Sequence, residues 1–188
     1  MSKDTSELVV AGSGSISVAP YGTALPTQYN TALNAAFDEL GYTTDDGLTW
    51  GSNPTVEKFT AWQSRQPVRV ALTALEQRLT CTLQQWNERT IITAFGGGDF
   101  IQMQAGSFKY VPIADTEQLD EVSIVADWQD GTEQYRIVIP RALVTESVEV
   151  NLTRTNLAVL PVTFDVLKVA GSDAWNLLTN GSQFNVAS

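Results

Sequence analysis

The stretch that decides the fold runs from Pro67 to Gly98 and reads PVRVALTALEQRLTCTLQQWNERTIITAFGGG. Its first part alternates apolar and polar residues, as a strand with one buried face does. The apolar residues are even-numbered as far as Ala74 and odd-numbered from Leu79 onward. Because a shift of one residue turns every later side chain to the other face, this change predicts a bulge or tight turn between the two residues. No Gly, Pro, Asn or Asp lies between them, so we expect one bulged, bent strand rather than a hairpin.

The predicted strand is longer than a domain of this size can hold. Extended from Val68 to Trp86, it would span roughly 60 Å. A compact domain of 188 residues is only about 40 Å wide. The strand must therefore bend strongly or protrude from its own domain. A protruding strand needs a neighbour, and this is the first indication of assembly.

A helix is expected directly after this strand. Asn87 is a good N-cap residue, and Gly96 suits the position that follows the last turn. Between them, Ile91, Ile92 and Phe95 fall on one apolar face. The pattern predicts a helix of about two or three turns, docked on a sheet through this face.

Composition excludes several classes of function. The chain has 43% hydrophobic residues, enough for a core, and a net charge of −10 with no histidine. The missing histidine excludes His-dependent triads and His metal sites, and the acidic balance disfavours direct nucleic-acid binding. One cysteine, Cys81, excludes an intrachain disulfide and a multi-Cys zinc site, and its place in an apolar row predicts a buried thiol. With no signal pattern and no long apolar run, we expect a soluble protein, made in a reducing compartment, that has no membrane partner.

The whole pattern predicts a mainly β chain, an antiparallel β-sandwich or barrel with one flanking α-helix. Asp130-Gly131, between two alternating runs, is the strongest hairpin signal. Helical spacing also predicts a short helix or turn over Asn30–Leu40. We expect one β domain over residues 14–169, between an N-terminal arm (1–13) and a C-terminal arm (170–188). Further strands are expected over 14–20, 99–112, 122–129, 133–139, 142–152 and 157–169.

A long polar segment, residues 51–66, precedes the opening strand. It is only weakly patterned, and a connection of this length is usually functional. We therefore expect an intersubunit loop, in which Val56, Phe59 and Trp62 supply the apolar contacts. Trp50 and Trp62 flank this loop and suit the same interface. The alternative is an ordered surface loop with its aromatic side chains turned inward.

No catalytic, cofactor or metal site is expected. The three glycines at 96–98 follow the predicted helix instead of preceding one, so they suit a helix end better than a phosphate cradle. The acidic pairs lack the spaced oxygen ligands of a calcium loop and are best explained as solvated turn charges. These pairs are Asp45/Asp46 and Asp120/Glu121. Asp127 and Asp130 would suit the carboxylates of a glycosidase, but nothing in the sequence singles them out.

A series of short stretches, taken in order, is similar to a known family. They are VAPYGT (18–23), LPT (25–27), ALNAAFDELGY (32–42), DDGLT (45–49), AWQ (61–63) and the strand over 68–86. Together they resemble the major tail tube protein of long-tailed, non-contractile (siphovirus-type) bacteriophages. Many members append an immunoglobulin-like domain, and the short segment after Val169 is expected to lack one.

The resemblance implies a virion tail protein, assembled in the host bacterial cytoplasm, that forms hexameric rings. These rings would stack into a hollow tube around the tape-measure protein, between the tail terminator and tail-tip proteins, with DNA as passing cargo. Arg78, Thr80, Thr82 and Gln84 point away from the predicted core and are the hypothetical bore-facing residues. An acidic bore would let DNA slide instead of sticking.

Three alternatives stay open. Exposed tryptophans would suit a carbohydrate-binding β-sandwich module, and paired carboxylates would suit a β-sandwich hydrolase. The inner tube of a contractile tail or injection system would share the ring architecture. The sequence by itself does not separate the last alternative from a non-contractile tail.

Overall fold

The computed structural model describes residues 7–114, 118–146 and 148–184. Within them the chain is mainly β, with one α-helix and a short 3-10 helix at Ser182–Phe184. The strands are β1 (Ser13–Pro20), β2 (Asp38–Glu39), β3 (Thr43–Ala61), β4 (Ser64–Leu83), β5 (Asp99–Gln104), β6 (Ser107–Val111), β7 (Val122–Asp130), β8 (Glu133–Val144), β9 (Leu160–Val166) and β10 (Asn176–Thr179); the helix α1 is Glu88–Ala94.

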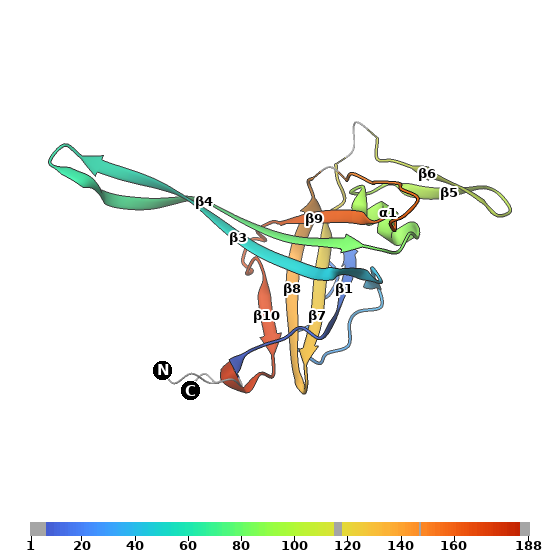
Figure 1. Ribbon diagram of the computed structural model, residues 1–188, viewed down its shortest axis with the longest axis horizontal. Coiled ribbons are helices and arrows are strands. Elements are labelled where there is room, and N and C mark those ends of the chain that lie inside the picture. The colour runs from blue at the N-terminus through green and yellow to red at the C-terminus, as the bar shows by residue number, and fades with distance from the viewer. Residues whose placement is uncertain (1–6, 115–117, 147, 185–188) are drawn as a thin grey trace.

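The main sheet has the strand order β2-β1-β7-β8-β9-β4-β3, with β10 added beside β8, and all its pairings are antiparallel. Figure 1 shows that β3, β4 and β9 run across β1, β7 and β8, so the sheet folds over into two crossing layers. β5 and β6 form a separate two-stranded sheet beside α1. The predicted mainly β fold with one flanking helix is confirmed.

Strand β8 makes the corner between the layers. Most of it pairs with β7, whereas its last residues, Ala142 to Val144, pair with β9. The β7–β8 register shifts at Ser123, whose hydroxyl donates a hydrogen bond of 2.8 Å to the carbonyl of Pro140. Since Pro140 has no N–H to donate, it is tolerated where the ladder is already irregular. Asp130-Gly131 forms the predicted hairpin turn, because Asp130 pairs with Glu133.

The core lies between the layers and takes side chains from β1, β4, β7, β8 and β9. The predicted odd-numbered row of β4 is part of it, since Leu79, Cys81 and Leu83 are all buried. Cys81 is buried, as predicted, and burial raises the pKa of its thiol to about 12. The fully buried bulky side chains are Phe164, Ile16, Leu40, Leu79, Leu83, Ile124, Ile139 and Leu160.

The predicted bulge in β4 is present, just before the expected window. Thr55 pairs with Ala74 and the next residue, Val56, pairs with Leu72, which leaves Thr73 as the extra residue. The apolar row therefore passes from Leu72 to Leu75. The assignment of Ala74 to this row was wrong.

The predicted loop over 51–66 is wrong as a structural element. Residues up to Ala61 belong to β3, residues from Ser64 belong to β4, and only Trp62 and Gln63 form the turn. The segment looks unpatterned because most of its residues are exposed on both faces, so no buried face imposes an apolar alternation. Pro54 is tolerated because β3 is the edge strand.

Helix α1 begins where it was predicted. The Asn87 side chain accepts a hydrogen bond of 2.9 Å from the Thr90 N–H, and the Thr90 hydroxyl accepts one of 3.0 Å from the Asn87 N–H. The predicted buried face is wrong at Phe95, which is half-exposed, although Ile91 packs against the core. The buried residues are Thr90, Thr93 and Ala94.

Three other expected elements differ. Residues 30–40 form turns, one of the two predicted alternatives, but they also include the unpredicted short strand β2, and Leu40 is fully buried. The strand expected over 142–152 is only the end of β8, and the one expected over 99–112 is the β5–β6 hairpin. The C-terminal arm contains β10, which pairs with β8, so it is part of the sheet there. Of the two arms, residues 1–6 and 185–188 lie outside the described part of the chain.

Candidate functional site

The strands β3 and β4 extend far beyond the body of the protein. β9 pairs with β4 only from Arg78 to Leu83, so the outer part of β4 has β3 as its one partner in the described sheet. We call residues 51–77 the ribbon; Figure 1 shows it as a long, twisted projection from the two-layered body. An isolated two-stranded hairpin is marginally stable in water. Within the described chain, the ribbon therefore has no packed layer to stabilise it.

One face of the ribbon continues the core-facing side of the sheet. In the core, Trp50 pairs with Leu79. Since side chains alternate between faces, the partners on the same face further out are Ser52 with Gln77, Pro54 with Leu75, Val56 with Leu72 and Lys58 with Val70. We call Pro54, Val56, Val70, Leu72 and Leu75 the apolar face.

The bulge at Thr73 keeps this face aligned with the core. It shifts the numbering by one, so that even-numbered Val70 and Leu72 join odd-numbered Leu75 on one side. The Thr73 hydroxyl also donates a hydrogen bond of 3.0 Å to the Thr55 carbonyl across the ribbon. The change of parity in the sequence was thus the signal for the bulge that aligns the apolar face. The alternation itself did not show that Val70, Leu72 and Leu75 lie outside the core.

Exposure and charge both distinguish the ribbon. Val56 and Leu72 are 45% and 60% exposed, and Trp62 at the tip is 99% exposed. Contiguous exposed apolar side chains of this kind mark interaction surfaces. The ribbon carries three cations and two carboxylates, a net charge of +1, which leaves −11 on the rest of the chain. The cations are Lys58, Arg65 and Arg69.

The predicted contact residues do not share one surface. Val56 belongs to the apolar face, Phe59 pairs with Arg69 on the opposite face, and Trp62 forms the turn. Trp50 is partly buried. It packs against the core, with its ring edge-on to Trp175 at a centroid distance of 5.2 Å.

The hypothetical bore-facing residues lie on the side of β4 that faces away from the core. Arg78 is half-exposed and makes ion pairs with Glu146 at 2.8 Å and Asp165 at 2.9 Å. Thr80 lies opposite Thr163, with their hydroxyl oxygens 3.5 Å apart. Thr82 and Gln84 are partly buried. This surface is polar, and its one arginine is paired with two carboxylates.

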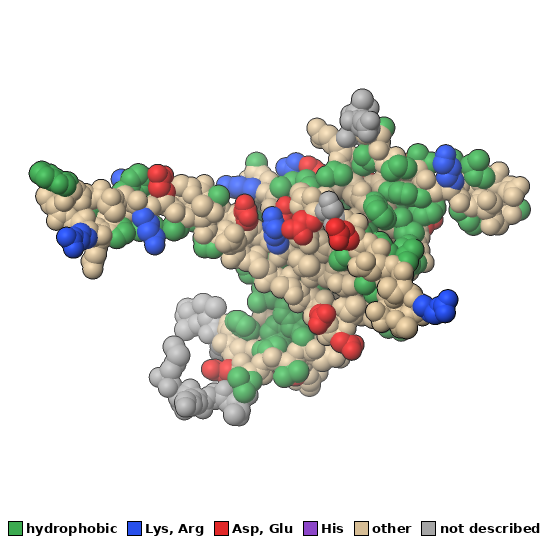
Figure 2. All heavy atoms as spheres, turned by 45° about the horizontal axis from the view of Figure 1, so that its top comes forward, with side chains coloured by type: hydrophobic (Ala, Val, Ile, Leu, Met, Phe, Trp, Pro, Cys, Tyr) green, Lys and Arg blue, Asp and Glu red, His purple; other side chains and the backbone are tan. Residues whose placement is uncertain are grey.

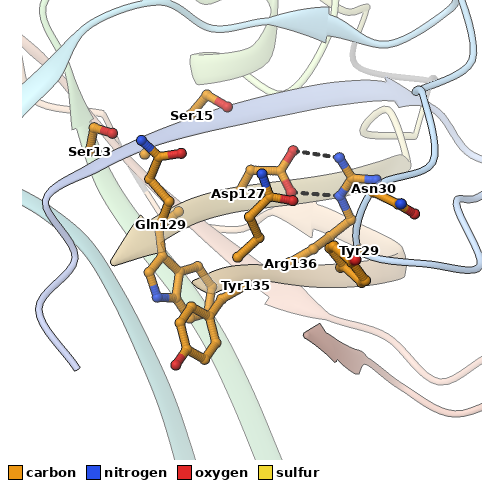
Figure 3. Close-up of a pocket in the computed structure, with 11 residues that line it drawn as sticks. Ser13, Ser15, Tyr29, Asn30, Asp127, Gln129, Tyr135 and Arg136 are labelled. Atoms are coloured by element: carbon orange, nitrogen blue, oxygen red, sulfur yellow. Dashed lines mark hydrogen bonds and ion pairs between the residues drawn. The ribbon is translucent and has the colours of Figure 1, made fainter. Parts of the chain in front are cut away.

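A hollow lies near the turn of the β7–β8 hairpin. Figure 3 shows Asp127 of β7 and Arg136 of β8 side by side in the wall of this hollow, joined by two hydrogen bonds. The Arg136 Nε and Nη2 donate to Asp127 at 2.6 and 2.9 Å, and Nη1 donates to the carbonyls of Thr31 and Gln28 at 2.6 and 3.3 Å. Arg136 is buried, so these bonds hold the connector after β1 against the body. Both carboxylate oxygens of Asp127 accept hydrogen bonds from Arg136.

The tryptophans do not form a sugar-stacking surface. Trp128 stacks on Tyr135 with a centroid distance of 5.3 Å, and Trp50 packs on Trp175. The Trp86 indole N–H donates a hydrogen bond of 2.8 Å to the Ala158 carbonyl. Only Trp62 exposes its whole ring. A platform for sugars needs several aromatic faces together, and the described structure does not gather them.

The other acidic pairs also have structural surroundings. A hydrogen bond from Arg141 lowers the pKa of Glu121, and Asp130 accepts a hydrogen bond of 2.7 Å from the Val10 N–H. Asp45 and Asp46 are exposed in an irregular stretch of β3. Over the described residues, no three His, Cys, Asp or Glu side chains are grouped to hold a metal, and no helix there is long and apolar enough to cross a membrane.

Comparison with known proteins agrees with a structural role. A search of curated proteins found no match. A family model described as phage tail tube protein matches residues 1–187, almost the entire chain. The chain therefore belongs to the phage tail tube protein family and is a structural component of a phage tail.

Proposed function

We propose that this protein forms hexameric rings that stack into the hollow tube of a non-contractile phage tail, through which DNA passes into the host. The observation that carries the proposal is the ribbon. Its apolar face continues the core-facing side of the sheet, yet it has no covering layer within the described chain. A neighbouring subunit would supply the missing layer. The role is structural rather than catalytic.

The energetics favour a partner for the ribbon. Full burial of a Val or Leu side chain contributes roughly 1.5–3 kcal/mol, and four such half-exposed side chains are available: Val56, Val70, Leu72 and Leu75. A contact between two different surfaces of the same protein can repeat from one copy to the next. Such a chain of copies closes into a ring when the rotation between neighbouring subunits adds up to a full turn. Closure also removes the exposed edge of β3.

The polar side of β4 is proposed to face the bore. Arg78, Thr80, Thr82 and Gln84 lie there, and the pairing of Arg78 with Glu146 and Asp165 leaves no unpaired cation among these four. A surface of hydroxyls and carboxylates gives phosphates no strong attachment, which suits DNA as a passing cargo. The tape-measure, terminator and tail-tip proteins are proposed partners on the strength of the family.

The test is to remove the ribbon and image the product. A variant that lacks residues 53–76 and joins Ser52 to Gln77 through Asn-Gly keeps the strand pairing of the body, because Ser52 and Gln77 are partners. We expect negative-stain microscopy to show rings or tubes for the native protein and folded monomers for the variant. Tubes formed by the shortened protein, or strictly monomeric native protein at every concentration, would reject the proposal.

A further inference from the structure

A second projection lies at the end of the molecule away from the ribbon. The β5–β6 hairpin extends there beside α1, as Figure 1 shows. Phe100 pairs with Tyr110 across this hairpin, and Phe108 lies two residues before Tyr110, so all three share one face. Phe95, at the end of α1, contacts Tyr110 with a centroid distance of 5.9 Å. We call these four residues the aromatic strip.

Two residues of the aromatic strip are exposed, and the other two, Phe100 and Tyr110, are partly buried. Phe108 is 65% exposed and Phe95 is half-exposed. In Figure 2, hydrophobic side chains gather around the root of the hairpin on this end of the protein. Aromatic side chains concentrate at the energetic centres of protein interfaces because they bury much area with few rotatable bonds. The strip has the composition of an interface centre.

The strip is also held in place before any partner arrives. The Tyr110 hydroxyl donates a hydrogen bond of 2.6 Å to the Gly97 carbonyl, and the Phe100 and Tyr110 rings lie 5.3 Å apart. A Cβ at Gly98 would lie 2.5 Å from the Val111 carbonyl oxygen, so glycine permits this close approach of the hairpin to the loop after α1. Such preorganisation lowers the entropic cost of binding.

We propose that the aromatic strip is the docking site for the ribbon of a second copy of this chain. The inference rests on the proposed function and names the surface that receives the ribbon. The two surfaces are chemically complementary, since the ribbon offers Val and Leu side chains and the strip offers aromatic rings. They lie at opposite ends of one chain, which is the arrangement a head-to-tail contact requires.

Charge supports the same occupant. The part of the ribbon nearest its turn, residues 58–70, carries three cations and no carboxylate. Residues 88–114 and 118–121, which include the strip, carry four carboxylates and two cations, a net charge of −2. Opposite net charges steer the two surfaces together and disfavour contacts between two ribbons or two strips.

The experiment uses two complementary full-length variants. Leu72→Asp disables the apolar face of the ribbon but keeps the strip, whereas Phe108→Asp disables the strip but keeps the ribbon. We expect each variant alone to be a folded monomer, and an equimolar mixture to give a heterodimer that cannot grow further. Analytical ultracentrifugation measures both results, and circular dichroism monitors folding.

Two matched controls test the face of the hairpin. Ile101 pairs with Lys109 on the other side of the hairpin and is also exposed, so Ile101→Asp should still assemble. Phe108→Leu keeps an apolar side chain and should retain most of the assembly. If Ile101→Asp blocks assembly as strongly as Phe108→Asp, the aromatic strip is not the docking face and the inference is wrong.

The outcomes separate the two proposals. If Leu72→Asp still forms tubes, the ribbon proposal itself fails. If Leu72→Asp is blocked while Phe108→Asp assembles normally, or if the mixture gives no heterodimer, the ribbon docks elsewhere and only this inference fails. Should Phe108→Asp misfold, a mixture of Leu72→Cys and Phe108→Cys chains can be used instead. If the ribbon docks on the strip, we expect a disulfide between the thiol introduced at position 72 of one chain and the thiol introduced at position 108 of the next. Buried Cys81 does not compete, and a failure to cross-link in assembled tubes would overturn the inference.

Discussion

Val56 lies directly opposite Leu72 in the ribbon, on the same face as the pair formed by the partly buried Trp50 and the buried Leu79. One continuous row of a single β-ladder is thus partly core and partly surface. The difference lies in the layer that covers it, because the body shields the inner pair and no described segment shields the outer one. This relationship underlies the assembly role and can be tested residue by residue.

Replacing Val56 by Asp should abolish assembly with little effect on folding. The side chain is 45% exposed, so the free energy of unfolding should change by about 0.5 kcal/mol or less. A carboxylate in the docked interface should weaken association at least tenfold, since burying an unpaired charge is costly. Sedimentation and thermal unfolding measure the two effects. Thr55→Asp, on the opposite face, is the matched control, and equal loss of assembly in both variants would contradict a face-specific contact.

Lysines introduced at Thr80 and Thr82 should make assembled tubes retain DNA. Both residues lie on the polar side of β4, and a ring of lysines there would attract phosphates. Short double-stranded DNA should elute with the double variant at low salt and be released as salt is raised. A pair of lysines at exposed Asp45 and Asp46 is the control. If only the control retains DNA, the polar side of β4 does not line the bore.

Removing Arg136 should destabilise the body without changing the ribbon. Arg136→Ala leaves Asp127 and the carbonyls of Thr31 and Gln28 without their donor, at an expected cost of about 2–4 kcal/mol. Chemical denaturation measures this cost. Arg136→Lys should recover only part of it, because an ammonium cannot form the two parallel bonds to Asp127. Additive effects of Arg136→Ala and Asp127→Asn in a double-mutant cycle would show that the pair is not coupled.

The ion pair between Glu121 and Arg141 should contribute to acid sensitivity. The hydrogen bond from Arg141 lowers the pKa of Glu121 in the folded protein. The stabilisation is therefore complete above the ordinary glutamate pKa of about 4.3, and it is lost as the pH falls through the lower folded-state pKa. Glu121→Gln should lower the melting temperature at pH 7 and have a smaller effect near pH 3.

Exposed Glu149 provides the comparison for this pH effect. Glu149→Gln should leave the melting temperature nearly unchanged at both pH values. An effect of Glu121→Gln that is equal at pH 7 and near pH 3 would show that ionisation of Glu121 does not stabilise the fold.

Sequence patterns were reliable where a local rule and burial agreed. The Asp130-Gly131 turn, the Asn87 cap and the buried row from Leu79 to Leu83 all satisfy a local rule inside a packed body. The helical spacing over 30–40 misled because Leu40 is instead buried beside an extended segment that pairs with β1. Tertiary contacts outweighed a weak local preference there.

By itself, the sequence determined that the chain is a β protein with an overlong, bulged strand, because side-chain alternation and parity are local properties of a strand. Only the tertiary structure showed that residues 51–61 pair with that strand, that its apolar row leaves the core beyond Leu79, and that an aromatic strip lies at the other end. These features depend on long-range register and on which surface covers which. A solvent-exposed ribbon has no buried face to impose an alternation, so its sequence carries no local sign of its partner strand.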